Sequence, residues 1–238
     1  MEEIVLTLLV KALAFDTGGT VLDWHSGVSA TLAAVGVRRS VDGDWPAVTN
    51  EYRRRALKGM TGQVRPSFNI DDVHRRVVDE LATEFGWSAF TNEDRNEIVR
   101  AWHALDAWPD FADVLARLRR RYVVVSFTIL STSLIVDVSR RNGLSWDGIV
   151  SCEMIGSYKP NPEAYATCAR WLGYKPEEVM VVACHNFDLL AARKVGFRTA
   201  FVRRPDEWGA AGPPDPTPAP SLDIVLDDFG QLADRLGA

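Results

Sequence analysis

Short apolar runs rich in β-branched residues recur along the chain and alternate, in its second half, with amphipathic segments. Runs of this kind are typical of strands buried on both faces of a sheet. Strands are expected at residues 9–15, 122–125, 148–150, 179–182, 199–202 and 224–226. Helical periodicity fills residues 134–141, 162–172 and 189–195. Strands that alternate with helices predict an α/β protein in which helices cover a parallel sheet.

Residues 24–104 follow a different pattern, with amphipathic segments at 45–57, 71–85 and 93–103 and no convincing strand. They are interpreted as a helical insertion after the first strand. The expected organisation is a core domain of residues 1–23 and 105–238 and a cap domain of residues 24–104. The proline-rich segment 203–221 predicts a surface loop before the last strand, and a C-terminal helix is expected to end near Leu236.

The amino-acid composition limits how large the hydrophobic core can be and which classes of partner are expected. With 238 residues, 47% of them hydrophobic, the chain can bury the core of one large domain with a smaller insertion. The net charge of −5 argues against a general binder of phosphate backbones, so no nucleic-acid partner is expected. A small anionic substrate would therefore need a local cationic pocket.

The cysteines and the N-terminal segment indicate the compartment. The three cysteines are odd in number and form no CxxC pair, which argues against a disulfide framework or a zinc site and suits a reducing cytoplasm. The apolar start begins with two acids and is interrupted by Lys11, so it is not interpreted as a signal peptide. No uninterrupted apolar run reaches membrane-spanning length, and no membrane partner is expected.

Polar residues follow several of the expected strands. Asp16 follows the first strand, Ser126 the second, and Asp188 lies just after the fourth, while Lys159 falls in the loop after the third. Ligands of open parallel sheets bind at the carboxyl ends of the strands. The sequence therefore predicts that two carboxylates, a hydroxyl and an ammonium group meet at one edge of the sheet.

The order and spacing of these residues resemble the haloacid dehalogenase superfamily over nearly the whole chain. The motifs are DTGGT from Asp16, VVVSF with Ser126, YKPNPEAY with Lys159 and CHNFD with Asp188. The helical insertion after the first motif adds to the likeness. The resemblance is to the 2-haloacid dehalogenases, and it implies a three-layer, Rossmann-like core with a helical cap.

The resemblance also implies roles for the motif residues. Asp16 would be the nucleophile, and an aspartate is ionised at neutral pH without help. Thr20 would fix one of its carboxylate oxygens, and Lys159 would balance its charge. Ser126 would hold the nucleophile or the substrate, and Asp188 would anchor Lys159 and help to activate water.

The residue two places after the nucleophile separates activities in this superfamily. Phosphatases carry an aspartate there as general acid and base, whereas this chain has Gly18, which has no proton to give. The fourth motif offers Asp188 flanked by Asn186 and Phe187, which leaves the phosphatase Mg²⁺ without a ligand, so no metal or other cofactor is expected. A halide leaves without a proton. Displacement at carbon is therefore favoured, with an ester on Asp16 that water then hydrolyses.

Haloacid dehalogenases also bind the carboxylate of their substrate through a cationic group of the cap. Arg53, after Tyr52 in NEYRRRAL, matches this position best, and Arg54 and Arg55 remain open as alternatives. A guanidinium suits a carboxylate because it donates two parallel hydrogen bonds. Tyr165 matches a family tyrosine that packs near the nucleophile.

Three departures from the family pattern put the substrate in doubt. Ser126 is followed by Phe127 rather than by Asn-Gly, His185 stands where an asparagine is usual in the fourth motif, and Gly18 replaces a bulky pocket residue. His185 could assist water activation, since histidine titrates near neutral pH. Phe127, Gly18 and Asn186 are therefore counted with Arg53 and Tyr165 as candidate substrate-binding residues.

Other functions remain open at this level. Some relatives open a strained ring beside a carboxylate, as in azetidine-2-carboxylate hydrolysis, and a phosphatase or an inactive binding module would share the fold. The expected partner is a small carboxylate. Relatives of this type are often dimers, which leaves a homodimer open.

Overall fold

One parallel sheet forms the centre of the protein. The computed structural model describes residues 9–238, so the interpretation of the first eight residues lies outside it. The six strands lie in the order β3-β2-β1-β4-β5-β6. They are β1 (Ala12–Phe15), β2 (Val123–Thr128), β3 (Gly148–Ser151), β4 (Val179–Ala183), β5 (Arg198–Val202) and β6 (Ile224–Leu226). This topology confirms the predicted α/β fold.

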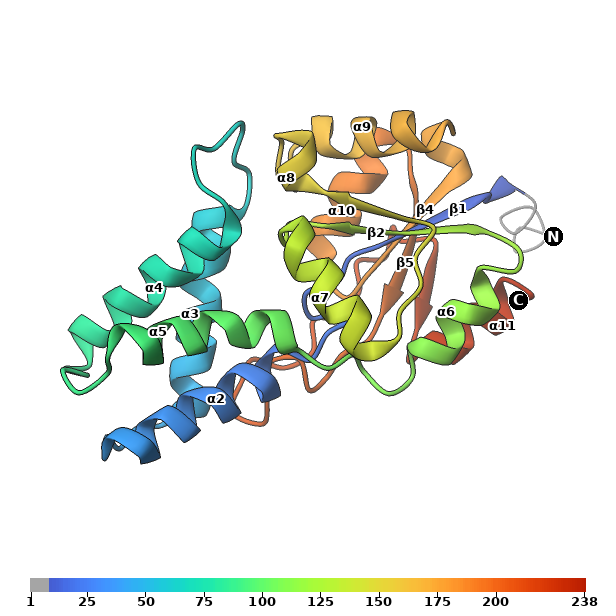
Figure 1. The fold of residues 1–238 in the computed structure, drawn as a ribbon. Coiled ribbons are helices and arrows are strands. Elements are labelled where there is room, and N and C mark those ends of the chain that lie inside the picture. Colours follow the sequence, from blue (N-terminus) through green and yellow to red (C-terminus); the bar gives the residue numbers. More distant parts are fainter. Residues whose placement is uncertain (1–8) are drawn as a thin grey trace.

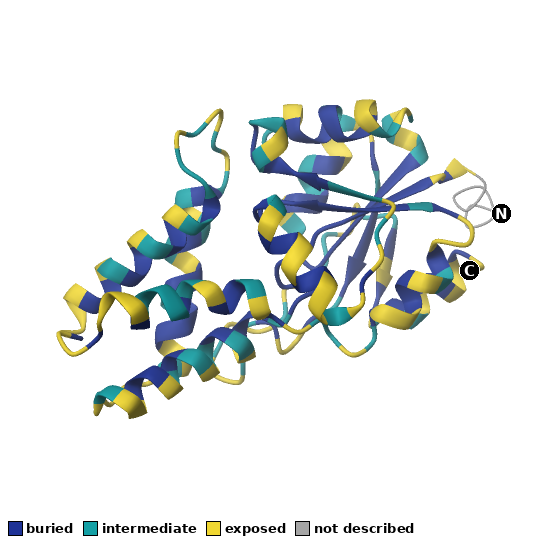
Figure 2. Cartoon of the chain, in the orientation of Figure 1, coloured by how far each residue is buried: buried dark blue, intermediate teal, exposed yellow. Residues whose placement is uncertain are grey.

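Helices cover both faces of the sheet (Figure 1). Helices α9 (Pro162–Leu172) and α10 (Asn186–Val195) lie on one face. The other face carries α6 (Ala112–Leu118), α7 (Thr132–Asn142) and α11 (Phe229–Arg235). The strands are almost wholly buried between these layers, while the outer faces of the helices are exposed (Figure 2). Short helices α8 (Cys152–Ile155) and η2 (Pro176–Glu178) complete the core.

A second group of helices lies to one side of the sheet (Figure 1). These cap helices are α2 (Trp24–Arg39), α3 (Trp45–Met60), α4 (Ile70–Glu84), α5 (Asn92–Arg100) and η1 (Ala101–Ala104). Asp44 caps α3, and Asn69 and Thr91 form capping boxes that begin α4 and α5. None of the helices within residues 9–238 combines the length and apolar character needed to cross a membrane.

The second strand is longer than expected, and the first is shorter. The prediction that β2 ends at Ser126 is wrong, because the strand continues to Thr128. A buried serine interrupts the apolar run without interrupting the strand. The first strand begins at Ala12 rather than at residue 9.

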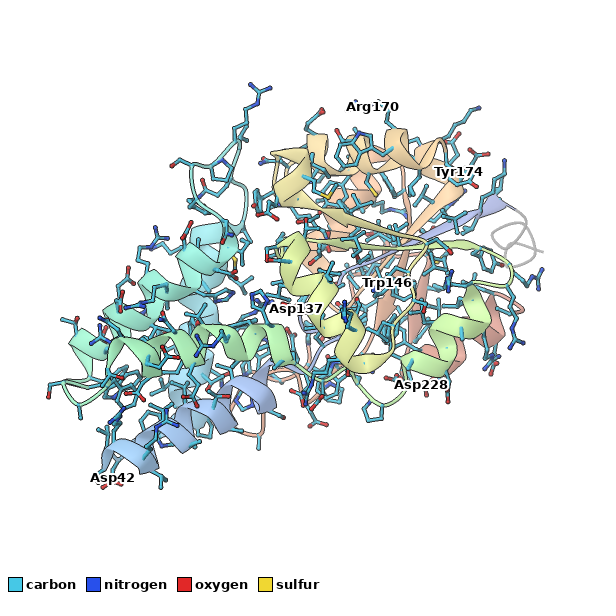
Figure 3. All side chains as sticks on the ribbon, viewed as in Figure 1. Asp42, Asp137, Trp146, Arg170, Tyr174 and Asp228 are labelled. Carbon is cyan, nitrogen blue, oxygen red and sulfur yellow. The ribbon has the colours of Figure 1, made fainter. Side chains whose placement is uncertain are left out.

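Several hydrogen bonds join the cap helices to the core. His103 of η1 contacts Asp137 of α7 at 2.7 Å and Asp71 of α4 at 3.2 Å, and Asp137 lies beside the cap helices (Figure 3). The loop after α3 pairs with the segment before α9, where the Gly62 amide donates to the Lys159 carbonyl at 2.9 Å. The cap is thereby tied to the backbone that carries Lys159.

Candidate active site

Asp16 follows β1 at the point where the strand order reverses. Strand β1 pairs with β2 on one side and with β4 on the other. The crevice at such a switch point is where open α/β sheets bind ligands. Gly19 has a φ of 96°, a conformation that favours glycine, and it lets the chain turn sharply behind Asp16.

The two oxygens of the Asp16 carboxylate have different partners. Oδ1 lies 3.2 Å from the Lys159 Nζ. Oδ2 accepts a hydrogen bond from the Thr20 hydroxyl at 2.7 Å and lies 3.1 Å from the His185 Nδ1. Burial alone would raise the pKa of Asp16, but the Lys159 charge and the hydrogen bonds from His185 and Thr20 hold it well below its usual range. The carboxylate is therefore held in its ionised form.

Lys159 lies between two buried carboxylates. Its Nζ is 2.6 Å from Asp188 Oδ2, and the other Asp188 oxygen accepts from the Tyr165 hydroxyl at 2.6 Å. The Phe127 ring supports the ammonium, with its centroid 4.5 Å from Nζ. Burial opposes the charge, but Asp188 and Asp16 raise the pKa of Lys159 above its usual value. Lys159 is thus held as a cation beside Asp16.

Phe127 and Tyr165 contact this ion pair, although the sequence predicted them as substrate-binding residues. The Phe127 ring packs edge-on against Tyr165 and under Lys159, and both aromatic side chains are fully buried. Their placement serves to position Lys159 and Asp188. A direct contact of either residue with a substrate stays a prediction.

Arg53 is the arginine of the cap that reaches the site. It is buried, and its Nη2 donates to the Gly18 carbonyl at 3.2 Å. The guanidinium lies against both Trp24 and Trp102, 5.4 Å from each ring centroid. Within the described residues its Nε and Nη1 have no hydrogen-bond partner. The side chain therefore holds two buried donor nitrogens without partners close to the loop that follows Asp16.

The alternatives to Arg53 point elsewhere. Arg54 and Arg55 form ion pairs with Glu51, and Arg55 also pairs with Glu84. Gly18 leaves room for Arg53, because a β-carbon at this position would lie 3.1 Å from Nη2 of that arginine. The space left where Gly18 replaces a bulky residue is thus partly filled by the arginine.

Ser126 is not brought to Asp16. It is in register with Phe15, whose ring packs on Phe111 and Phe229 on the face that carries α6 and α11. The next residue, Phe127, faces Lys159, and side chains alternate along a strand. The Ser126 hydroxyl is buried and has no partner among residues 9–238. The expected hydrogen bond between Ser126 and Asp16 is therefore absent from this part of the chain, and a contact of Ser126 with a substrate stays a prediction.

Thr128 occupies the place at the end of β2 that was expected for Ser126. Its hydroxyl lies 2.7 Å from that of Thr17, the residue after the nucleophile, and accepts from the Leu130 amide at 3.0 Å. The apolar run continues through Phe127 to this threonine, which is the signal in the sequence that could have identified it. Thr128 holds the nucleophile loop to the neighbouring strand.

Asn186 does not contact Asp16. Its amide nitrogen donates to the Thr217 carbonyl at 2.8 Å, and its oxygen accepts from the Ala219 amide at 2.9 Å. Both polar groups thus fix the proline-rich loop against α10. The predicted role in substrate binding is not supported by this geometry.

The same proline-rich loop delivers a buried carboxylate that the sequence did not reveal. Glu207 lies 3.0 Å from His185 Nε2 and accepts from Trp24 Nε1 at 3.1 Å. Burial favours the neutral acid, but His185 and Arg53 hold the pKa of Glu207 below its usual value. A glutamate in an aperiodic loop carries no pattern, so only the fold could place it here.

Metal binding can be judged from the donor atoms. Within residues 9–238 the group spaced for a metal ion is Cys184, His185 and Glu207, whose donor atoms lie within 4.8 Å of one another. These atoms already contact one another, and His185 also contacts Asp16. Asp188, the acidic residue of the fourth motif, is engaged through both oxygens by Lys159 and Tyr165. Lys159 thus stands between Asp16 and Asp188, where it supplies the positive charge.

Comparison with known proteins gives consistent matches. The sequence model of the haloacid dehalogenase-like hydrolase family matches residues 10–196. The crystal structure of the defluorinating L-2-haloacid dehalogenase Rha0230 is 35% identical and superposes with a TM-score of 0.89 over 96% of each chain. That of the L-2-haloacid dehalogenase PA0810 is 33% identical, with a TM-score of 0.87 over 96% of this chain and 99% of the other. The (S)-2-haloacid dehalogenase 4A of Burkholderia cepacia is 28% identical over 207 residues, which cover 82% of this chain and 84% of that protein.

Proposed function

Because this chain belongs to the haloacid dehalogenase-like hydrolase family, we propose that it hydrolyses the carbon–halogen bond of a short 2-halocarboxylic acid without a metal ion. The observation that carries the proposal is the pairing of two charges across the site. An ionised Asp16, held by Lys159, lies at the end of β1, and Arg53 presents two free donors beside the Gly18 carbonyl. A carboxylate bound to Arg53 would bring its own α-carbon near the nucleophile.

The first step of the proposed reaction is a displacement at carbon. An oxygen of Asp16 attacks the α-carbon of the substrate, and the halide leaves with the bonding electron pair. The product is an ester between Asp16 and the α-carbon. Oδ1 is the better placed nucleophile, since Oδ2 is already engaged by Thr20 and His185. The lack of a general acid at position 18 does not slow this step, because a halide leaves without a proton.

The second step regenerates the enzyme. Water adds to the carboxyl carbon of the ester, and the oxygen of the 2-hydroxy acid leaves as the carboxylate of Asp16 forms again. One proton of the water ends on the product hydroxyl, and the other passes to solvent. Asp188, next to Lys159, is the base proposed to receive the proton of the attacking water.

A second candidate reaction has one observation in its favour. His185 contacts Asp16 through Nδ1. Burial would lower the pKa of His185, but Cys184, Glu207 and Asp16 raise it well above the usual value. A proton held so close to the reacting atoms would suit an amine leaving group, as in the opening of azetidine-2-carboxylate. The arrangement around Asp188 disfavours a Mg²⁺-dependent phosphatase, because both oxygens are already bound.

Halide release distinguishes these candidates. With EDTA present, the protein is expected to release halide from chloroacetate, fluoroacetate or 2-chloropropionate, measured by ion chromatography. Azetidine-2-carboxylate and an aryl phosphate are the comparison substrates. Release of phosphate that requires Mg²⁺, with no halide from any haloacid, would refute the proposal.

Arg53 is expected to bind the carboxylate of the substrate. Replacing it in the Arg53→Lys variant removes the two-pronged donor while keeping the charge, and kcat/KM for chloroacetate should fall by about 10²-fold. Arg54→Lys is the matched control, since Arg54 is an exposed neighbour, and its kcat/KM should stay within about twofold. Equal losses in the two variants would mean that Arg53 does not recognise the carboxylate.

A further inference from the structure

The two ring nitrogens of His185 both face carboxylates. Nδ1 lies 3.1 Å from Asp16 Oδ2, and Nε2 lies 3.0 Å from Glu207 Oε1. An ionised carboxylate only accepts hydrogen bonds, so each nitrogen carries a hydrogen when both contacts are made. Trp24 Nε1 donates to the same oxygen of Glu207, which marks that oxygen as an acceptor. His185 is thus a donor at both nitrogens, with no free lone pair to take a proton.

The hydroxyl of Thr20 is oriented in the same way. It accepts a hydrogen bond from the Cys184 amide at 3.1 Å, which leaves its hydrogen free for Asp16 Oδ2 at 2.7 Å. Two donors, Thr20 and His185, therefore converge on one oxygen of the nucleophile. The other oxygen has only Lys159, at 3.2 Å, among the residues that the structure describes.

We propose that His185 and Thr20 form an oxyanion hole for hydrolysis of the Asp16 ester, and that Glu207 is the positioning residue that holds His185 in its donor state. This inference rests on the proposed covalent mechanism. It gives His185 a role different from water activation, because a donor at both nitrogens cannot act as a base.

The geometry fits the charge that develops in the second step. If Oδ1 forms the ester, Oδ2 becomes its carbonyl oxygen. When water adds to the carboxyl carbon, the electron pair of that carbonyl moves to Oδ2, where two donors already point. Donors placed in advance at a developing oxyanion are among the strongest contributors to catalysis, at about 10²–10³ in rate for one donor. The electron pair on Oδ2 then re-forms the carbonyl bond, and the oxygen of the 2-hydroxy acid leaves with a proton from the water.

Glu207 reaches this position from a distant part of the chain. It is buried and comes from the proline-rich loop, which Asn186 fixes against α10. The only negative charges that contact the His185 ring are Asp16 and Glu207, among residues 9–238. Loss of Glu207 should therefore release Nε2 and let the ring turn away from Asp16.

The His185→Asn variant distinguishes two possible roles of His185, a hydrogen-bond donor and a general base. The amide nitrogen of asparagine lies where Nδ1 of histidine lies, so His185→Asn keeps a donor to Oδ2 but cannot accept a proton. With chloroacetate, His185→Ala should hydrolyse the ester about 10²–10³-fold more slowly than the wild type. His185→Asn should hydrolyse the ester at least about tenfold faster than His185→Ala. Ester formation is followed by the mass of acid-quenched protein and by the burst of chloride.

Glu207→Gln tests the positioning role with a side chain of the same shape. This variant is expected to release one chloride per protein in a burst, to accumulate the ester and to turn over about tenfold more slowly. Glu177→Gln, at an exposed site in η2, is the matched control and should behave as the wild type. Near-ultraviolet circular dichroism checks that each variant is folded.

The outcomes separate the inference from the mechanism on which it rests. An ester in the wild type, with His185→Asn as slow as His185→Ala, would identify a base and overturn the inference while the covalent mechanism stands. The inference would also be overturned if the variants at His185 and Glu207 slowed the chloride burst but left the rate of ester hydrolysis unchanged. Turnover without any ester, in the wild type and in all variants, would overturn the covalent mechanism itself.

Discussion

Replacing the proposed nucleophile in the Asp16→Asn variant should lower halide release by at least about 10⁴-fold, with little loss of stability. An amide nitrogen or oxygen is a far weaker nucleophile than a carboxylate, and the other described carboxylates of the site are engaged. Asp188 is bound through both oxygens, and Glu207 lies behind His185. The variant therefore loses the covalent step and keeps the shape of the site.

The control for this variant is Asp113→Asn, an exposed aspartate in the first turn of α6. Its rate should equal that of the wild type. Intact-protein mass spectrometry checks that the introduced asparagine has not reverted to aspartate by deamidation during the assay. An Asp16→Asn protein that retains a tenth of the wild-type rate, with its amide intact, would show that water attacks the substrate directly.

The sheet was predictable because most of its strand residues are apolar and buried. The runs at β3, β4 and β6 stand out as apolar stretches, and their ends fall within a residue or two of the prediction. The end of β2 was missed, because Ser126 is a polar residue inside a buried strand. Helix α2 was missed as a separate element, although Asp23 caps its first turn.

The site divides into residues that a motif can reveal and residues that only the fold can place. Asp16, Thr20, Lys159 and Asp188 follow strands or lie in the motifs that the sequence displays, and the structure brings them together. Glu207 comes from an irregular loop whose path depends on tertiary contacts. Spacing in the sequence carries no information about such a contact.

The cap shows the same limit at the level of one side chain. Three consecutive arginines of α3 carry the same charge, and their order alone could not say which one turns inward. Packing against Trp24 and Trp102 selects Arg53, while Glu51 holds Arg54 and Arg55 at the surface of the cap. The aromatic partners come from α2 and η1, and the choice is therefore made by helix packing rather than by the motif.

Lys159→Met should cost both activity and stability, because this lysine neutralises two buried carboxylates. Breaking a buried ion pair by removing one partner costs about 3–5 kcal/mol, since the remaining charge is left without compensation. Halide release should fall by about 10³-fold as Asp16 loses its counter-ion. Urea denaturation measures the free energy of unfolding, and Lys58→Met, an exposed position of α3, serves as the matched control.

Two further measurements test whether the cause is electrostatic. Adding Asp188→Asn to Lys159→Met removes one of the stranded charges, so the double variant should regain stability without regaining activity. The deficit of Lys159→Met should also shrink as the pH falls. Burial already raises the pKa of Asp188 above its usual value, and without Lys159 the folded-state pKa of both carboxyls should exceed that of the unfolded chain. Protonation then relieves the folded state first, from neutral pH toward about pH 4. The stability deficit could instead be the same at neutral pH and at about pH 4, in both the single and the double variant. The loss would then come from packing around the lysine stem. The charge pairing that is proposed to keep Asp16 ionised would be contradicted.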